Sequence, residues 1–148
     1  MKLRKLLTMG LCSALALLTF GASHLRAEED KGEKTKIPET VEGIFTAIHQ
    51  HHMELTETVK AKKLADVHHH AFAIRDLANA LPAKAAADKK KAAEGTVKNI
   101  ATLAAALDES GDANDQPKTE ANLKKMDGLV KVLDVQFGQK PMTMPPAK

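Results

Sequence analysis

Apolar residues recur at intervals of three and four through four stretches of the chain between residues 38 and 137. That spacing gathers them on one face of an α-helix, which must pack against another element to leave water. The four sets are Val41, Phe45, Ile48, Leu55 and Val59; Val67, Ala71, Ile74, Leu77, Ala78 and Leu81; Ala93, Val97, Ile100, Leu103, Ala104 and Leu107; and Leu123, Met126, Val130, Leu133 and Phe137. Because no alternating, strand-like pattern accompanies them, we expect an all-α fold.

The first two expected helices form a hairpin. The first spans residues 38–61, with Pro38 in its first turn, where a missing backbone N–H is tolerated. The second spans residues 64–81 and is expected to stop at Pro82, since proline breaks the helical hydrogen-bond pattern. A linker this short forces the two helices to be antiparallel neighbours.

The second half of the chain predicts another helical pair. One helix covers residues 93–109, and residues 83–91 are either a loop or the beginning of that helix. Residues 110–115 read as a polar connector. The last helix starts after an Asp115 N-cap and ends at Gly138. The expected architecture is an antiparallel, up-down-up-down four-helix bundle over residues 38–137.

The chain begins with the pattern of a secretory signal peptide. Lys2, Arg4 and Lys5 precede an apolar run, and Ala27 provides a small residue for cleavage. We therefore expect residues 1–27 to be removed and the protein to be secreted or periplasmic, without a membrane anchor. Residues 28–37 are expected to form a flexible lead-in, and residues 138–148 a disordered tail rich in methionine and proline.

Removing this leader changes the charge and the available chemistry. The leader holds four of the 22 basic and none of the 19 acidic residues, which leaves 18 basic and 19 acidic side chains, a net charge of −1. Such a balance argues against nucleic-acid binding. The single cysteine, Cys12, lies in the leader, so neither disulfides nor thiolate ligands are expected in the bundle.

Histidines gather at the two ends of the expected hairpin turn. Six of the seven in the chain lie in two clusters: His49, His51, His52, His68, His69 and His70. His52 and His70 fall within the apolar stripes and are predicted to face each other, with His49 and His68 as flanking ligands. His51, at the edge of its stripe, is a weaker candidate. Neutral imidazole binds copper, nickel, cobalt and zinc, so this hairpin predicts a transition-metal site.

Methionines near these clusters and in the tail favour copper among those metals. Met53 follows the first histidine cluster, and Met142 and Met144 form a Met-x-Met pair. Thioethers are soft donors that select Cu(I). The three methionines are weaker ligand candidates. The resulting hypothesis is an exported bundle for metal sequestration, delivery or sensing, with a metal-efflux or metal-trafficking protein as its partner.

Two other interpretations stay open. The helix pattern over residues 38–137 resembles exported four-helix bundles such as the soluble b-type cytochromes and cytochrome c-prime. That resemblance implies a haem, for which His52 and His70 are the candidate axial ligands. The chain lacks Cys-x-x-Cys-His, and it lacks the histidine on the last helix that the b-type resemblance implies. The other alternative is a structural or partner-binding bundle without a metal.

No motif points to an enzyme. A di-iron bundle requires Glu-x-x-His, and no glutamate stands three residues before any histidine of the chain. His-Glu-x-x-His is also missing. No catalytic residue is therefore predicted.

Overall fold

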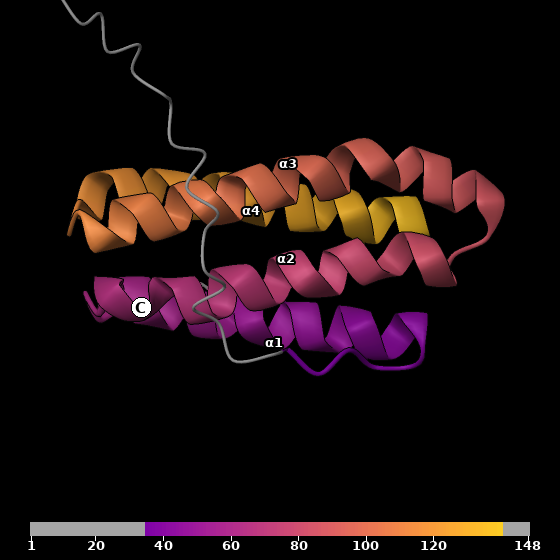
Figure 1. Ribbon diagram of the computed structural model, residues 1–148, viewed down its shortest axis with the longest axis horizontal. Coiled ribbons are helices and arrows are strands. Elements are labelled where there is room, and N and C mark those ends of the chain that lie inside the picture. The colour runs from indigo at the N-terminus through magenta and orange to yellow at the C-terminus, as the bar shows by residue number, and fades with distance from the viewer. Residues whose placement is uncertain (1–34, 141–148) are drawn as a thin grey trace, which may run out of the picture.

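The computed structural model describes residues 35–140, and these fold into the expected all-α bundle. Four α-helices and one short 3-10 helix account for nearly all of them, and no strand occurs in this part of the chain: α1 Val41–Lys60, η1 Leu64–Asp66, α2 Val67–Lys84, α3 Ala87–Asp112 and α4 Gln116–Phe137. Successive helices run in opposite directions (Figure 1). The predicted up-down-up-down topology is confirmed.

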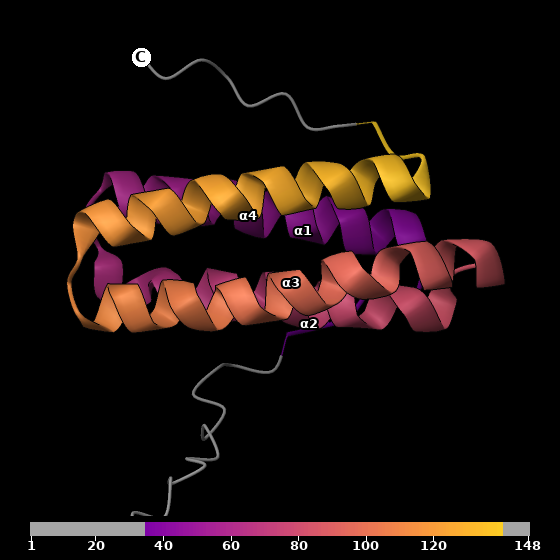
Figure 2. The ribbon, with the colours of Figure 1, turned by 90° about the horizontal axis from the view of Figure 1, so that it is seen from above.

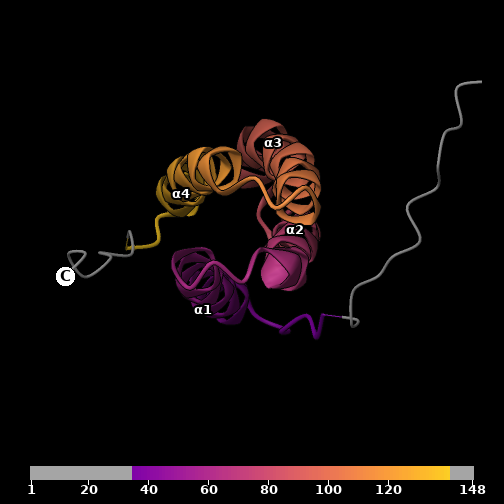
Figure 3. The ribbon, with the colours of Figure 1, turned by 90° about the vertical axis from the view of Figure 1, so that its left-hand side faces the viewer.

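Viewed along the bundle, the four helices occupy the corners of a square in chain order (Figure 3). Helices α1 and α4, the first and the last, therefore lie next to each other, as Figure 2 also shows. Their contact is the least extensive of the four neighbouring pairs. The Gln116 side chain at the start of α4 donates a 3.0 Å hydrogen bond to the Val59 carbonyl of α1. Among the described residues, no helix is long and apolar enough to cross a membrane.

The predicted apolar stripes line the core, with Val41 and Leu123 only partly buried. One polar residue, His52, belongs to the set of large side chains that are almost completely buried. That set is Ile44, Phe45, Ile48, His52, Leu55, Ile74, Leu77, Leu81, Ile100, Leu107, Met126 and Leu133.

Helix α1 begins later than the sequence predicted. Pro38 lies outside the helix, and Thr40 is the N-cap, where its side-chain oxygen accepts a 3.0 Å hydrogen bond from the Gly43 N–H. A threonine in this position satisfies a backbone donor that the first turn leaves free. Pro38 packs so close to Gly43 that a Cβ there would lie 3.0 Å from the proline Cβ.

Helix α2 continues through Pro82, so the predicted stop at that residue is wrong. The helix ends at Lys84, and Ala85 is extended. Proline removes one hydrogen bond and crowds the carbonyl four residues earlier, but Pro82 lies in the last turn, so only two helical residues follow the disturbance. The Lys84 ammonium donates a 3.1 Å hydrogen bond to the Glu39 carbonyl, which fastens the end of α2 to the segment before α1.

Helix α3 is longer at both ends than its predicted core. Residues 87–91 form its beginning, and residues 110–112, predicted as part of a connector, form its last turn. The Ser110 hydroxyl donates to the Leu107 carbonyl at 3.1 Å. Gly111 packs against the Leu64 carbonyl oxygen, and a Cβ there would lie 2.5 Å from that oxygen. Tertiary packing, which a polar sequence does not reveal, keeps this turn helical.

Helix α4 has the predicted ends. The Asp115 side chain accepts a 3.0 Å hydrogen bond from the Lys118 N–H, and Gly138 terminates the helix in a left-handed conformation. The signal peptide predicted at 1–27, most of the lead-in and the tail beyond residue 140 lie outside the described residues.

Candidate metal centre

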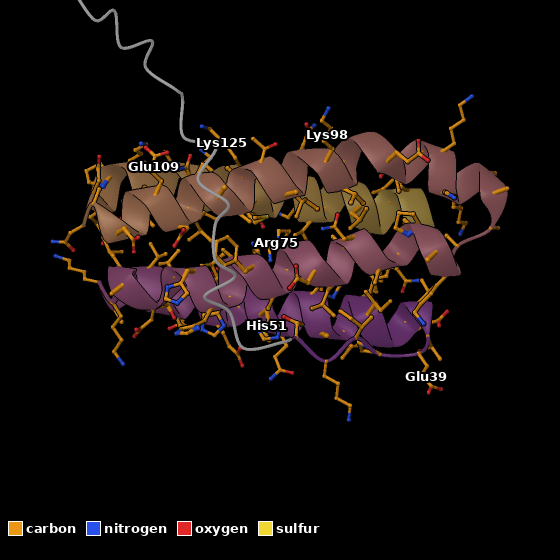
Figure 4. All side chains as sticks on the ribbon, viewed as in Figure 1. Glu39, His51, Arg75, Lys98, Glu109 and Lys125 are labelled. Carbon is orange, nitrogen blue, oxygen red and sulfur yellow. The ribbon has the colours of Figure 1, made fainter. Side chains whose placement is uncertain are left out.

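Three potential ligands meet on the outer side of the α1–α2 pair. His51 and Glu54 come from α1, at positions i and i+3 on one face, and His70 comes from α2. We refer to His51, Glu54 and His70 as the hairpin site. Figure 4 labels His51 on α1, where that helix runs beside α2.

The three ligand atoms of the hairpin site form a nearly equilateral triangle. The Nδ1 atoms of His51 and His70 are 3.4 Å apart. The Oε2 atom of Glu54 lies 3.4 Å from the first of these nitrogens and 3.3 Å from the second. A tetrahedral ion bound at about 2.0–2.1 Å separates its ligand atoms by about 3.3–3.4 Å. The spacing of the three atoms therefore matches one face of a tetrahedral metal site.

The chain reversal between α1 and α2 brings these residues together. Lys62 adopts a left-handed conformation with φ of 57°, and the short helix η1 follows before α2 begins. The antiparallel hairpin then places His70 at the level of His51, with the two ring centres 5.7 Å apart.

Glu54 is oriented by its own helix. The Gln50 amide, one turn earlier, donates a 3.1 Å hydrogen bond to Glu54 Oε1. The other oxygen, Oε2, is the one that faces both imidazoles. A ligand carboxylate held in this way loses less freedom when it binds an ion.

The hairpin site is partly open to solvent, and His70 is suited to remain neutral. The side chains of His51, Glu54 and His70 are 31%, 41% and 23% exposed. Burial is the main cause that lowers the pKa of His70, and His51 lowers it further, while Glu54 acts in the opposite direction. A lowered pKa leaves the imidazole neutral at pH 7, as metal binding requires.

The structure brings His51, rather than His52, next to His70. His52 is 1% exposed, and three of the charged residues that act on its ring, Asp127, Lys131 and Asp134, lie on α4. Neither ring nitrogen has a hydrogen-bond partner, and burial lowers its pKa. Among the described residues, the group that could hold a metal therefore contains His70 with His51 and Glu54, and not with His52.

His49 also turns toward α4. Its Nε2 lies 2.8 Å from Oδ1 of Asp134, a carboxylate with no exposed surface. The ring packs against Phe45, with 6.2 Å between the ring centres. His49 is thus separated from the hairpin site and pairs α1 with α4.

The remaining candidates are not part of the hairpin site. His68 Nδ1 donates to the Ala65 carbonyl at 2.8 Å, and its ring lies 3.9 Å from that of His69, which is exposed. Met53 is 46% exposed on α1. Met142 and Met144 lie outside the described residues.

Glu54 is the candidate ligand that the sequence analysis missed. The Glu-x-x-His pattern has its carboxylate three residues before a histidine, whereas Glu54 stands three residues after His51. The i, i+3 spacing places both side chains on the same flank of the helix in either order, so the His-x-x-Glu order indicates this pair equally well.

A scan against protein-family models matches no family, and searches of curated proteins and of solved structures find no match.

Proposed function

We propose that this protein binds a divalent transition-metal ion at the hairpin site and acts in metal sequestration, delivery or sensing in an exported space. The observation that carries the proposal is the triangle of two imidazole nitrogens and one carboxylate oxygen with sides of 3.3–3.4 Å. The exported location rests on the leader at residues 1–27.

The donor set narrows the choice of metal. Two imidazoles and a carboxylate suit Zn²⁺, Co²⁺, Ni²⁺ and Cu²⁺, and they offer no soft sulfur for Cu(I). Copper(II) is expected to bind tightest of the four, because affinities for such sites follow the Irving–Williams order. Which metal is bound in the cell then depends on which metal is available there.

Three ligands leave a fourth position free in a tetrahedral site. Because the hairpin site is partly exposed, that position faces solvent, where water or a donor from another protein can occupy it. An ion held by three ligands at the surface can be passed on by ligand exchange, which fits delivery to a metal-efflux or metal-trafficking partner.

Calorimetric titration of the purified protein with each divalent metal tests this proposal. We expect one equivalent to bind, and expect His51→Ala, Glu54→Gln and His70→Ala each to weaken binding by about tenfold or more. His69→Ala is the matched control, since this exposed neighbour of His70 lies outside the site. Equal losses in His69→Ala and His70→Ala would show a loose histidine cluster in place of the proposed centre.

A further inference from the structure

A groove runs along the outer side of the α3–α4 pair, across the bundle from the hairpin site (Figure 3). Its volume is about 710 Å³, which lies within the range of roughly 300–1,000 Å³ that small-molecule pockets have in proteins. Leu103 of α3 and Gly128, Leu129 and Val132 of α4 form its apolar part. We refer to it as the α3–α4 groove. Its size and lining are those of a site for a small apolar molecule.

Gly128 keeps the α3–α4 groove open. A Cβ at this position would meet no atom within 4 Å, so packing inside the bundle does not require a glycine here. Glycine in the interior of a helix also destabilises it relative to alanine. The missing side chain instead leaves room on the outside of α4, beside the partly buried Leu129 and the 46% exposed Val132. A bound molecule can therefore lie directly against the α4 backbone.

Lys125 supplies a positive charge near one end of the groove. It is the only charged residue among the described residues that line the groove. Its ammonium donates a 3.4 Å hydrogen bond to the Asn122 amide oxygen, and no carboxylate of the described residues pairs with it. Asn122 is 5% exposed and donates to the Ala106 carbonyl at 3.1 Å, so its position is fixed by α3. The nearby Asp127 is occupied by Lys131 at 2.7 Å. The ammonium is thus free to pair with an anion from outside.

The groove is apolar on the side away from Lys125. From Asn122 to Val132 it follows α4 for about 15 Å. Val135, one turn further along α4, continues this surface and is 69% exposed. An apolar chain that covers the two valines removes them from water. A cation near one end and an apolar surface along the rest together match a molecule with an anionic head and an apolar tail.

We propose that the α3–α4 groove binds a small anionic amphiphile, a molecule with one carboxylate and an unbranched acyl chain. The carboxylate pairs with Lys125, and the chain lies over Gly128 toward Val132. A second copy of the protein fits this face less well, because a symmetric contact brings the Lys125 side chains of both copies toward each other. Lys98 lies on the same outer side of the bundle and adds to that repulsion (Figure 4). The groove shares no residue with the hairpin site, so the two proposals are independent.

Calorimetric titration of the metal-free, purified protein with laurate, below the concentration at which laurate forms micelles, tests this proposal. Laurylamine is the matched ligand, since at pH 7 it has the same chain with a positive head. We expect one equivalent of laurate to bind, at least about tenfold more tightly than laurylamine, because a charge-assisted hydrogen bond to Lys125 is replaced by repulsion.

Two pairs of variants examine the two ends of the ligand. Gly128→Leu fills the groove and should abolish laurate binding. Gly95→Leu is its control, because this exposed glycine of α3 also has no atom within 4 Å of an added Cβ and does not line the groove. Lys125→Glu should reverse the preference, so that laurylamine binds more tightly than laurate. Lys124→Glu, at the exposed neighbour outside the groove, should keep the preference of the wild type.

Three results would overturn the proposal. The first is laurate binding that survives in Gly128→Leu or does not distinguish laurate from laurylamine. The second is binding to phosphatidylglycerol vesicles without binding of free laurate, which would show that the face contacts a membrane. The third is a monomer–dimer equilibrium that Gly128→Leu abolishes in the absence of laurate binding, which would show that a second copy covers the groove. Zn²⁺ binding at the hairpin site should be the same in all four variants.

Discussion

The two seams of α1 use neighbouring histidines in different ways. On the α2 side, His51 joins His70 and Glu54 at a partly exposed surface. On the α4 side, His52 is buried with both ring nitrogens unpaired, and His49 pairs with a buried carboxylate. Successive helical residues differ by 100°, so a compact cluster in sequence is divided between two partners. The α2 side leaves its histidines partly exposed to solvent, whereas the α4 side keeps His52 buried and His49 against a buried carboxylate.

The largest expected effect is the gain in stability from a bound divalent metal, which should depend on the α2 side of α1 and not on the α4 side. At a free concentration of about 100 times Kd, an ion that binds only the folded protein stabilises it by about 2.7 kcal/mol. Thermal unfolding with and without Zn²⁺ measures this gain. His51→Ala should abolish the gain, and His52→Leu should retain it. A gain that survives in His51→Ala but disappears in His52→Leu would place the ion on the α4 side.

Replacing His52 by leucine should increase stability. A buried polar group without a hydrogen bond costs about 1–3 kcal/mol, and leucine fills a similar volume without polar atoms. Urea unfolding of metal-free His52→Leu should therefore give a higher free energy of unfolding than that of the wild type. Lower stability would mean that a bound water satisfies the ring nitrogens.

The bundle could be predicted from the spacing of the apolar residues. The short linker also predicted that the two histidine clusters would lie side by side at one position along α1 and α2. The sequence could not predict that His51, rather than His52, lies beside His70. A helical wheel shows which residues lie at the edge of an apolar stripe, but not which neighbouring helix packs against each edge. That depends on how four helices close into a square. The helical state of Gly111 was missed for a related reason, since its cause is contact with the distant Leu64.

Lowering the pH should destabilise the protein mainly through His52, on the α4 side of α1. Burial lowers the pKa of His52 in the folded state, so below about pH 6.5 the unfolded chain binds more protons than the folded one. The stability that neutral His52 contributes is therefore fully present above that pH. It is lost as the pH falls toward the folded-state pKa, by up to about 1.4 kcal/mol per pH unit. His70 shifts in the same direction. Urea unfolding between pH 7.5 and 5.5 should show a shallower loss for His52→Leu, whereas an unchanged slope would exclude His52 as the cause.

The smallest effect is expected at the turn that leads to the hairpin site. Lys62 has φ of 57°, a conformation that costs most residues about 1–2 kcal/mol and glycine almost nothing. Lys62→Gly should stabilise the protein by a few tenths to about 1 kcal/mol, because glycine's greater freedom in the unfolded chain offsets part of the gain. Lys63→Gly is the control: its φ is −87°, so glycine relieves no strain and should lower stability.

Metal affinity in the same two variants shows what holds His51 opposite His70. If core packing along α1 and α2 sets their level, Zn²⁺ affinity should be the same in Lys62→Gly as in the wild type, since the turn only connects helices whose register is already determined. A weaker affinity despite higher stability would mean that the strained lysine turn itself positions the two imidazoles. The hairpin site would then depend on the loop, while the α4 side depends on the core.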